Sequence, residues 1–457
     1  MSNNIIDFKE IIFTKIAQWR YFTGLDFHVL ATLFFRGWAV FAGGATILLL
    51  PLWLSPIEQG YYFTFSSILA LQVFFELGLN QIIMQLVSHE VAHLHETADG
   101  TFRGEASRLD RLSSLAILIQ RWYRIIALFF ALIGGAVGII FFKQKNIEQI
   151  SFLLEIWIIL IGATAINLWL SPKLSVMEGC GKVGQVARLR LIQSILGYSC
   201  FWIMLLSGSG LFASIAIPII GAACTTYWLK LNGYILKWLP SRVIDIKNEL
   251  RWRNDIFPLQ WRIALSWASG YLIFNLFIPV VFSRYGAIEA GRLGMALTVF
   301  SSISTIGMSW VNAKAPNFTM YISRGERKKL NTVFQAVFFR SVLATALLSL
   351  GIVVLGWYLN YLEILLMMRI SSPKILMILA GVTIANSMVF SMAIYMRAHR
   401  EEPMLIQSII VGLIIGFGVY FISIIGIFEM MFFYMIVSIA ISFPWTAWIF
   451  LKYFKRQ

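Results

Sequence analysis

Residues 251–271 read Arg-Trp-Arg-Asn-Asp-Ile-Phe-Pro-Leu-Gln-Trp-Arg-Ile-Ala-Leu-Ser-Trp-Ala-Ser-Gly-Tyr and join a basic segment to a long apolar run. Pro258 favours a helix start there, because its missing N–H would be unbonded in a first helical turn. Trp252 and Trp261 have amphipathic rings of the kind that settle at the headgroup level of a membrane. The stretch therefore predicts a point where the chain re-enters a membrane, with Arg262 one turn inside and half of the protein on either side.

The composition is that of a membrane protein. Of the 457 residues, 59% are hydrophobic, and the mean hydropathy is +0.77, well above the balance of a soluble domain. Apolar runs of about 20 residues recur along the chain, and in lipid such runs must be helices. We therefore predict an all-α polytopic membrane protein with twelve transmembrane helices. They run near 29–53, 60–87, 121–142, 150–171, 187–207, 211–236, 260–283, 291–313, 333–357, 375–396, 404–426 and 428–451.

The basic residues predict the orientation. Most of the 37 Lys and Arg residues lie in or beside the segments on one side of the membrane, and the positive-inside rule makes that side cytoplasmic. Both termini are then cytoplasmic. The net charge of +15 belongs to these cytoplasmic segments, so nucleic acid is not an expected partner.

Two short matches indicate an internal repeat. Residues 57–60 (Ile-Glu-Gln-Gly) open the second predicted span, and residues 288–291 (Ile-Glu-Ala-Gly) open the eighth. Leu-Ile-Gln-Ser-Ile occurs at 191–195 in the fifth span and again at 405–409 in the eleventh. Each pair lies six spans apart, as expected for two parallel six-helix lobes with a substrate site at their interface. The predicted parts are an N-terminal cytoplasmic segment (1–28), a first lobe (29–238), a cytoplasmic linker (239–259), a second lobe (260–451) and a cytoplasmic tail (452–457).

Polar residues inside the spans mark candidate functional positions, because each is costly in hydrocarbon. Gln72, Glu76 and Asn80 in the second span have i, i+4, i+8 spacing and share one helix face. The eighth span carries a comparable stripe, and the first and seventh spans each contribute an arginine. These further positions are Arg36, Arg262, Ser266, Ser269, Asn275, Thr298, Ser301 or Ser302, Thr305, Ser309, Asn312 and Lys314.

Each kind of polar residue has a second interpretation. Ser and Thr side chains also join transmembrane helices to one another without lining a cavity. Arg36 and Glu76 either face a wet cavity or form a structural ion pair with each other. The sequence leaves both interpretations open.

Two motifs match enzyme signatures but lie in the wrong context. Residues 89–93 fit H-E-x-x-H, in which two His bind zinc and the Glu activates water. The match lies where the second span leaves the membrane, with no third ligand at a known spacing, so we interpret it as a solvated helix end. Residues 179–184 fit G-x-G-x-x-G, but no βαβ unit surrounds them. We interpret these glycines as a tight turn between the fourth and fifth spans.

Three stretches resemble a known family. Residues 54–65 read Leu-Ser-Pro-Ile-Glu-Gln-Gly-Tyr-Tyr-Phe-Thr-Phe and are followed by Phe-Glu-Leu-Gly at 75–78. Together with 258–271 and with Trp-Val-Asn-Ala-Lys-Ala-Pro at 310–316, they resemble bacterial polysaccharide flippases of the Wzx type. These belong to the multidrug/oligosaccharidyl-lipid/polysaccharide exporter superfamily. The resemblance implies two six-helix lobes around a central cavity lined by spans one, two, seven and eight.

The resemblance also implies a function. The substrate would be a polyprenyl-pyrophosphate-linked oligosaccharide, moved from the cytoplasmic to the periplasmic leaflet of the bacterial inner membrane by a protein that is not an enzyme. Arg36, Arg262 and Lys314 are candidates for the pyrophosphate, because cationic side chains suit phosphate oxygens. Gln72, Asn80, Ser309 and Asn312 suit sugar hydroxyls. Glu76 would compensate charge or carry a coupling Na⁺ or H⁺; no other cofactor is expected.

Membrane lipid, a polysaccharide polymerase and the chain-length machinery are the other expected partners. A cation-coupled multidrug exporter of the same superfamily is the alternative function, and it would favour a hydrophobic, acidic pocket. A membrane-embedded glycan ligase or polymerase would be expected to carry a large periplasmic loop, whereas the outer connections here are short. A metalloprotease would depend on His89 and His93.

Overall fold

The computed structural model describes residues 27–97, 101–143, 150–233, 235–236, 239, 250–399 and 403–455. Apart from one short hairpin, β1 (Leu94–Glu96) paired antiparallel with β2 (Phe102–Gly104), the regular structure in these ranges is helical. Eight of the described helices are long and apolar enough to cross a membrane, or up to ten if each of two bent pairs forms one span. The prediction of an all-α polytopic membrane protein is confirmed. The predicted N-terminal segment and much of the predicted linker lie outside the described residues.

The first lobe is formed by the helices before residue 233. Helix α3 (Pro56–Leu69) begins with a capping box, in which the Ser55 hydroxyl accepts from the Glu58 N–H at 3.2 Å and the Ser55 N–H donates to the Glu58 carboxylate at 2.8 Å. Its elements are α2 (Phe27–Trp53), α3 (Pro56–Leu69), η1 (Ala70–Gln72), α4 (Val73–Glu76), α5 (Leu79–Val91), α6 (Ala106–Lys143), α7 (Ile150–Met177), η2 (Glu178–Lys182), α8 (Val183–Leu206), η3 (Gly210–Ile215) and α9 (Ala216–Asn232).

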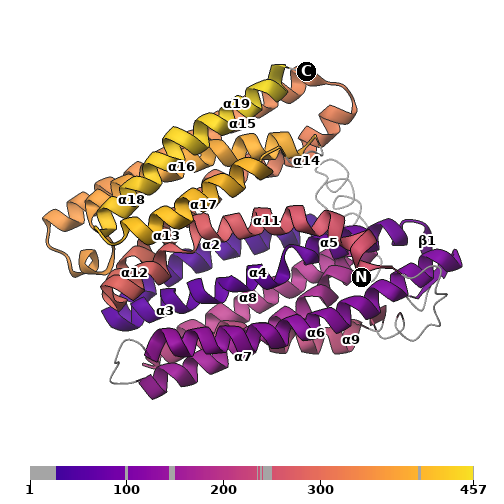
Figure 1. The fold of residues 1–457 in the computed structure, drawn as a ribbon, viewed down its shortest axis with the longest axis horizontal. Helices are drawn as coiled ribbons and strands as arrows, with labels where there is room; N and C mark the ends of the chain where they lie inside the picture. The colour runs from indigo at the N-terminus through magenta and orange to yellow at the C-terminus, as the bar shows by residue number, and fades with distance from the viewer. Residues whose placement is uncertain are drawn as a thin grey trace, which may run out of the picture.

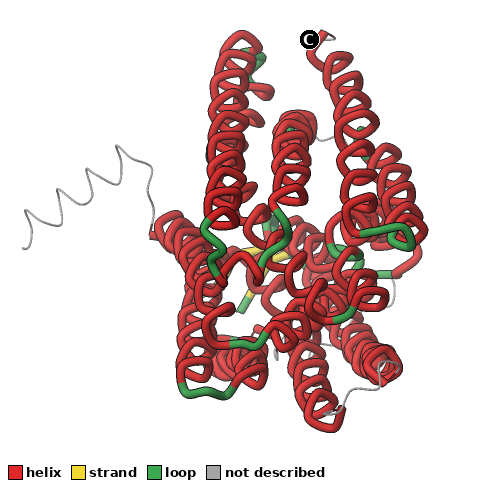
Figure 2. Tube along the Cα trace, turned by 90° about the vertical axis from the view of Figure 1, so that its left-hand side faces the viewer, coloured by secondary structure: helices red, strands yellow, loops and turns green. Residues whose placement is uncertain are grey.

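The second lobe follows a π-helical turn, and its first long helix begins at the predicted position, with Pro258 in the first turn. Its elements are η6 (Trp252–Ile256), α11 (Phe257–Phe274), α12 (Phe277–Tyr285), α13 (Ala287–Gly307), α14 (Ser309–Ser323), α15 (Arg327–Tyr361), η7 (Leu365–Arg369), α16 (Pro373–Arg397), α17 (Leu405–Ile422), α18 (Ile427–Ile436), η8 (Val437–Ser442) and α19 (Phe443–Lys455). Figure 1 shows α15, α16, α18 and α19 on one side of the molecule and the helices of the first lobe on the other, and Figure 2 shows the helical bundle from the side.

The second and eighth predicted spans are bent helix pairs rather than the single helices that their hydropathy predicts. The pair ending at Val91 and the pair ending at Ser323 are each bent by 42°. In the first pair, Leu77 and Gly78 both take left-handed backbone conformations, with φ of 48° and 69°. A Cβ on Gly78 would overlap the side chain of Ile263 on α11. The break therefore lets the second span approach the second lobe closely.

One glycine of the G-x-G-x-x-G match, Gly181, makes the break between two helices at the place where a tight turn was predicted. α7 and α8 are joined through η2, where Gly181 has a φ of 83°, outside helical values. A left-handed backbone at this point is easy for glycine and costly for other residues. The motif therefore shapes a connection between two membrane helices.

The lobes meet at one end of the molecule, at the positions that the internal repeat relates. Gly60 on α3 and Gly291 on α13 occupy equivalent places in the two repeats. A Cβ on Gly291 would lie 2.8 Å from the Gly60 nitrogen, and a Cβ on Gly60 would overlap the Ala287 carbonyl oxygen. The buried Gln59 amide donates to the Gly291 carbonyl at 3.1 Å and to the Arg369 carbonyl at 2.8 Å. We call this contact of α3 with α13 the glycine contact.

Away from that contact, α11 stays close to α4 and α5 of the first lobe, whereas the other long helices of the second lobe run apart from it. Figure 1 shows the lobes meeting near α3, α12 and α13 and separating toward the end that carries α5 and α14. An aromatic cluster supports the meeting point: the Phe282 ring on α12 lies 5.5 Å from Tyr61 on α3 and 5.2 Å from Phe141 on α6, between ring centroids. Aromatic pairs at these separations stabilise the contact between the lobes by more than the burial of their apolar surface alone.

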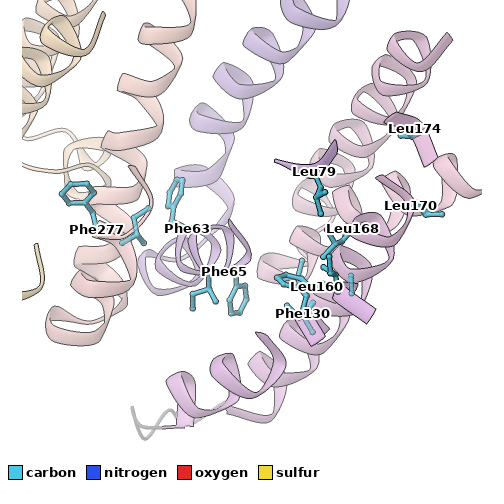
Figure 3. Close-up of a cluster of buried hydrophobic side chains, with 14 of the residues drawn as sticks. Phe63, Phe65, Leu79, Phe130, Leu160, Leu168, Leu170, Leu174 and Phe277 are labelled. Atoms are coloured by element: carbon cyan, nitrogen blue, oxygen red, sulfur yellow. The ribbon is translucent and has the colours of Figure 1, made fainter. Parts of the chain in front are cut away.

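The apolar core of the first lobe is continuous with this cluster. Figure 3 shows part of it, with Phe65, Phe130 and Leu160 contributed by α3, α6 and α7. Large apolar side chains on the outer surface, such as Leu132 on α6 and Val354 on α15, are 61% and 67% exposed. A membrane protein places such surfaces against lipid.

Candidate functional site

The first of three neighbouring cavities lies inside the first lobe and has a volume of about 400 Å³. Gln72, Glu76 and Asn80 all line it, so the predicted shared face of the second span points into one space. The opposite walls come from α7, α8 and α9. They contribute Asn167, Ser171, Ser175, Gln193 and Thr225, together with Glu178 at the start of η2 and Arg190 on α8.

Hydrogen bonds within this cavity fix several of its side chains. The Asn80 amide donates to the Ser171 hydroxyl at 3.1 Å, and the Tyr123 hydroxyl donates to the Asn80 carbonyl oxygen at 3.0 Å. Glu178 and Arg190 form an ion pair of 3.1 Å. Asn80 is therefore held by side chains of its own lobe in this conformation, and its predicted role in binding sugar hydroxyls stays a prediction.

Glu76 differs from the other charged groups of the first cavity. It is half-buried, and it forms no ion pair with any basic side chain that the structure describes. The side chain of Arg36 lies outside the described residues, although its backbone belongs to α2. The choice between an Arg36–Glu76 ion pair and a functional carboxylate therefore stays a prediction.

The second cavity lies between the lobes, where α4 faces α11, and has a volume of about 380 Å³. Gln72 and Glu76 form part of its wall and thus line two cavities at once. The facing wall consists of Trp267, Gly270, Tyr271, Phe274 and Asn275. The lining of this cavity thus combines one acidic residue with three aromatic residues.

The third cavity has a volume of about 490 Å³ and joins helices of both lobes. None of its lining side chains carries a formal charge, and many end in a hydroxyl or an amide. The polar lining residues are Ser66, Ser67, Asn275, Thr298, Ser301, Ser304, Thr305, Thr383, Asn386 and Tyr434. Thr298, Thr305 and Thr383 each donate to a carbonyl of their own helix, at 2.8, 3.0 and 2.7 Å. Their hydroxyl oxygens remain acceptors, so this surface suits a ligand rich in hydroxyl groups.

The three cavities are adjacent through shared residues. Gln72 and Glu76 line the first and second, and Phe274 and Asn275 line the second and third. Sequence reasoning found the second, seventh and eighth spans but missed the contribution of α16 and α18. Thr383 and Asn386 were visible as polar residues in an apolar span; nothing in the sequence showed which way they face.

The remaining predicted binding residues lie away from these cavities. Arg262, Ser309, Asn312 and Lys314 are exposed, and none of them lines the three cavities described above. The Arg262 guanidinium lies 5.4 Å from the centre of the Trp261 ring. Their roles in binding remain predictions.

The H-E-x-x-H match forms part of an ion-pair cluster. Glu90 is 3% exposed, and its two carboxylate oxygens accept from Arg108 at 2.9 Å and from Arg111 at 3.0 Å. A carboxylate that activates a zinc-bound water must have an oxygen free to accept its proton. The Glu90 carboxylate therefore forms structural ion pairs with two arginines, whereas the zinc motif would require it to act as a general base.

Substitutions in this ion-pair cluster should distinguish a structural role of residues 89–93 from a zinc site. We expect Glu90→Ala to lower the free energy of unfolding by about 2 kcal/mol, because two partly exposed arginines lose their buried partner. The double variant His89→Ala/His93→Ala should keep both its melting temperature and its transport activity, since the His89 side chain is 68% exposed. The measurements are thermal unfolding of the purified protein and transport. Lost transport in the histidine variant at normal abundance would contradict the structural interpretation.

Comparison with known proteins identifies the fold. No family model and no curated protein matches the sequence. Among solved structures, the lipid II flippase MurJ in an inward closed conformation is 14% identical, with a TM-score of 0.58 over 93% of this chain and 89% of that chain. An inward-facing multidrug resistance MATE family transporter of the MOP superfamily is 14% identical, with a TM-score of 0.54 over 90% and 99%.

A MOP superfamily transporter from Pyrococcus furiosus, described as having a binding pocket of reverse polarity, is also 14% identical, with a TM-score of 0.51 over 95% of this chain and 98% of that chain. Identities this low show the fold alone, and they confirm the predicted arrangement of twelve helices in two lobes. This chain is a multi-pass membrane protein with the two-lobe fold shared by MATE transporters of the MOP superfamily and the flippase MurJ.

Proposed function

We propose that this protein is a flippase that moves a polyprenyl-pyrophosphate-linked oligosaccharide from the cytoplasmic to the periplasmic leaflet of the bacterial inner membrane, for cell-surface polysaccharide assembly. The observation that carries the proposal is the third cavity, whose uncharged lining is rich in hydroxyls and amides from both lobes. Sugars cannot cross about 30 Å of hydrocarbon without polar partners. A polar cavity between two lobes supplies such partners.

The roles of the charged residues follow from the same chemistry. Arg36, Arg262 and Lys314 would receive the pyrophosphate, since none of the third cavity's lining residues is cationic and arginine suits phosphate oxygens. Gln72, Asn80, Ser309 and Asn312 would contact sugar hydroxyls. Glu76 would carry a coupling Na⁺ or H⁺.

Transport would proceed by rocking of one lobe against the other. With both termini cytoplasmic, the glycine contact lies on the periplasmic side, and the lobes diverge toward the cytoplasm. The structure then corresponds to the state that receives substrate from the cytoplasmic leaflet. A polysaccharide polymerase and the chain-length machinery would act on the product after its release.

One observation favours a second function, a cation-coupled multidrug exporter. Glu76 lines the second cavity together with the aromatic residues Trp267, Tyr271 and Phe274. A carboxylate beside aromatic rings suits an amphipathic organic cation. The two functions differ in the charge of the transported molecule, so one assay with two substrates separates them.

The test is reconstitution of the purified protein in liposomes with a fluorescent polyprenyl-pyrophosphate-linked oligosaccharide, or with ethidium in a parallel sample. We expect oligosaccharide to reach the far leaflet, where a lectin or glycosidase detects it. Transport of ethidium without oligosaccharide would favour the exporter. Transport of neither, under Na⁺ and proton gradients in turn, would contradict both proposals.

Arginine variants then test the site. Arg36→Ala and Arg262→Ala should abolish flipping while membrane abundance stays normal, and Arg→Lys should recover part of it, because lysine keeps the charge but loses the bidentate geometry. If Arg36 instead pairs with Glu76, Arg36→Ala should lower abundance, and Arg36→Ala/Glu76→Ala should restore it. Rescue of both abundance and flipping by the double variant would end the substrate-binding role of Arg36.

A further inference from the structure

The segment that leads into the second lobe docks on the outside of the first. The Trp252 ring lies 4.9 Å from the Trp122 ring of α6, between centroids. Asp255 forms an ion pair of 3.5 Å with Arg111, also on α6. Residues 250–256 are thus attached to one helix of the first lobe before α11 begins.

A groove of about 280 Å³ lies at this junction. Its lining residues are Ser114, Ile117, Leu118, Arg121, Trp122, Ile125 and Trp252. The Ser114 hydroxyl already accepts a hydrogen bond from the Leu250 N–H at 3.0 Å. Among the described residues that line the groove, only Arg121 carries a charge, and Trp122 and Trp252 supply aromatic rings.

Arg121 is available to an external anion. It is exposed, and it forms no ion pair with any acidic side chain in the described part of the chain. Arg251 and Arg253, both exposed, flank Trp252 in the sequence and add positive charge to the docked segment. Arg121, Arg251 and Arg253 together attract anions to a surface that is otherwise apolar.

The groove opens onto an apolar stripe that runs along α6. Ile125, Leu128 and Leu132 follow Arg121 at i+4, i+7 and i+11, so the four residues share one helix face. The three apolar side chains are 47%, 60% and 61% exposed. Arg121 stands at the start of the apolar part of this helix, where a headgroup would lie, and the stripe extends from it into the hydrocarbon.

We propose that this groove binds a phospholipid with an anionic headgroup. The phosphate pairs with Arg121, the glycerol region lies between Trp122 and Trp252, and one acyl chain follows the stripe from Ile125. The added positive charge of Arg251 and Arg253 favours a headgroup with net negative charge over a zwitterionic one. Basic pockets beside transmembrane helices recognise anionic lipids in this way. The bound lipid fastens residues 250–256 to the first lobe, at the point where the two lobes are joined.

The groove is separate from the proposed transport route. It shares no lining residue with the three cavities of the candidate site. Its lining has one cationic side chain and otherwise mostly apolar walls, so it provides few hydrogen-bond partners for sugar hydroxyls. The occupant is therefore a membrane phospholipid rather than the transported lipid, and the inference does not depend on which molecule the protein transports.

The test compares lipid binding by full-length variants in detergent micelles. Native mass spectrometry counts dioleoylphosphatidylglycerol retained by the wild type, by Arg121→Gln and by Arg340→Gln, a matched control that removes an exposed arginine of α15. Dioleoylphosphatidylcholine, with the same acyl chains, is the neutral probe. We expect Arg121→Gln to weaken binding of the tightest phosphatidylglycerol about tenfold, as for loss of one charge-assisted hydrogen bond, with Arg340→Gln unchanged.

Three results would overturn the proposal. The first is equal retention of phosphatidylglycerol by wild type and Arg121→Gln. The second is equal retention of phosphatidylcholine and phosphatidylglycerol by the wild type, which would show only an apolar annulus. The third is displacement of the bound phosphatidylglycerol by polyprenyl pyrophosphate, which would assign the groove to the transported lipid. Normal lipid binding with no transport activity would count against the proposed function alone.

Discussion

Replacing Gly60 by alanine is expected to reduce transport by at least about a hundredfold, because a clash that costs about 3 kcal/mol disfavours one of the two required conformations by that factor. The added methyl group would overlap the Ala287 carbonyl oxygen across the glycine contact. The three atoms nearest to that methyl group all belong to the Ala287 backbone. No side-chain rotation can therefore relieve the clash. The lobes would remain apart at this end, and the state shown here would be depleted.

The matched control is Gly351→Ala on α15, where an added Cβ meets no atom within 4 Å. Each variant replaces a helical glycine by alanine, so the change in helix propensity is the same in both. A difference in their transport rates therefore reports the effect of the glycine contact. Transport is measured together with labelling of a cysteine at Thr298, in a background lacking Cys180, Cys200 and Cys224. With Gly60→Ala, an impermeant maleimide on the periplasmic side should label Thr298→Cys faster. Unchanged labelling and transport would show that the contact does not close the cavity.

Glu76→Gln is the second substitution expected to have a large effect. Glu76 lines both the first and the second cavity, and it has no ion-pair partner among the side chains that the structure describes. Glutamine keeps the size and hydrogen-bonding capacity of the side chain but can neither hold Na⁺ as a carboxylate does nor exchange a proton. We expect transport to fall by about two orders of magnitude and to lose its dependence on the driving ion gradient.

The control for this substitution is Glu105→Gln. Glu105 lies just before α6, and its side chain is 65% exposed. Transport is measured in liposomes under a Na⁺ gradient and, separately, under a proton gradient, and membrane abundance is measured for each variant. A normal rate with unchanged ion dependence in Glu76→Gln would exclude a coupling role. A drop in abundance instead of rate would support the structural ion pair with Arg36.

The sequence by itself determined the class of fold. Apolar runs of span length must be helices in lipid, so the helices follow from composition, and Pro258 marked the start of α11 within the first turn. Gln72, Glu76 and Asn80 line one cavity, as their i, i+4, i+8 spacing predicted. The left-handed backbone at Leu77 and Gly78 breaks the span between Glu76 and Asn80, however, so the bent pair of helices sets this common wall and not the period of a single helix.

Tertiary structure decided everything that depends on a second helix. The repeat marked Gly60 and Gly291 as equivalent, but only the packing of α3 on α13 shows that these equivalent residues touch. The sequence marked Asn80 as a polar residue inside a span, and only the structure shows that Tyr123 and Ser171, from two other helices, form hydrogen bonds with it. Hydrocarbon removes water as the default partner of a polar group, so neighbouring helices satisfy it instead. Which neighbour does so is set by packing between segments far apart in the chain, and periodicity along one segment carries no information about it.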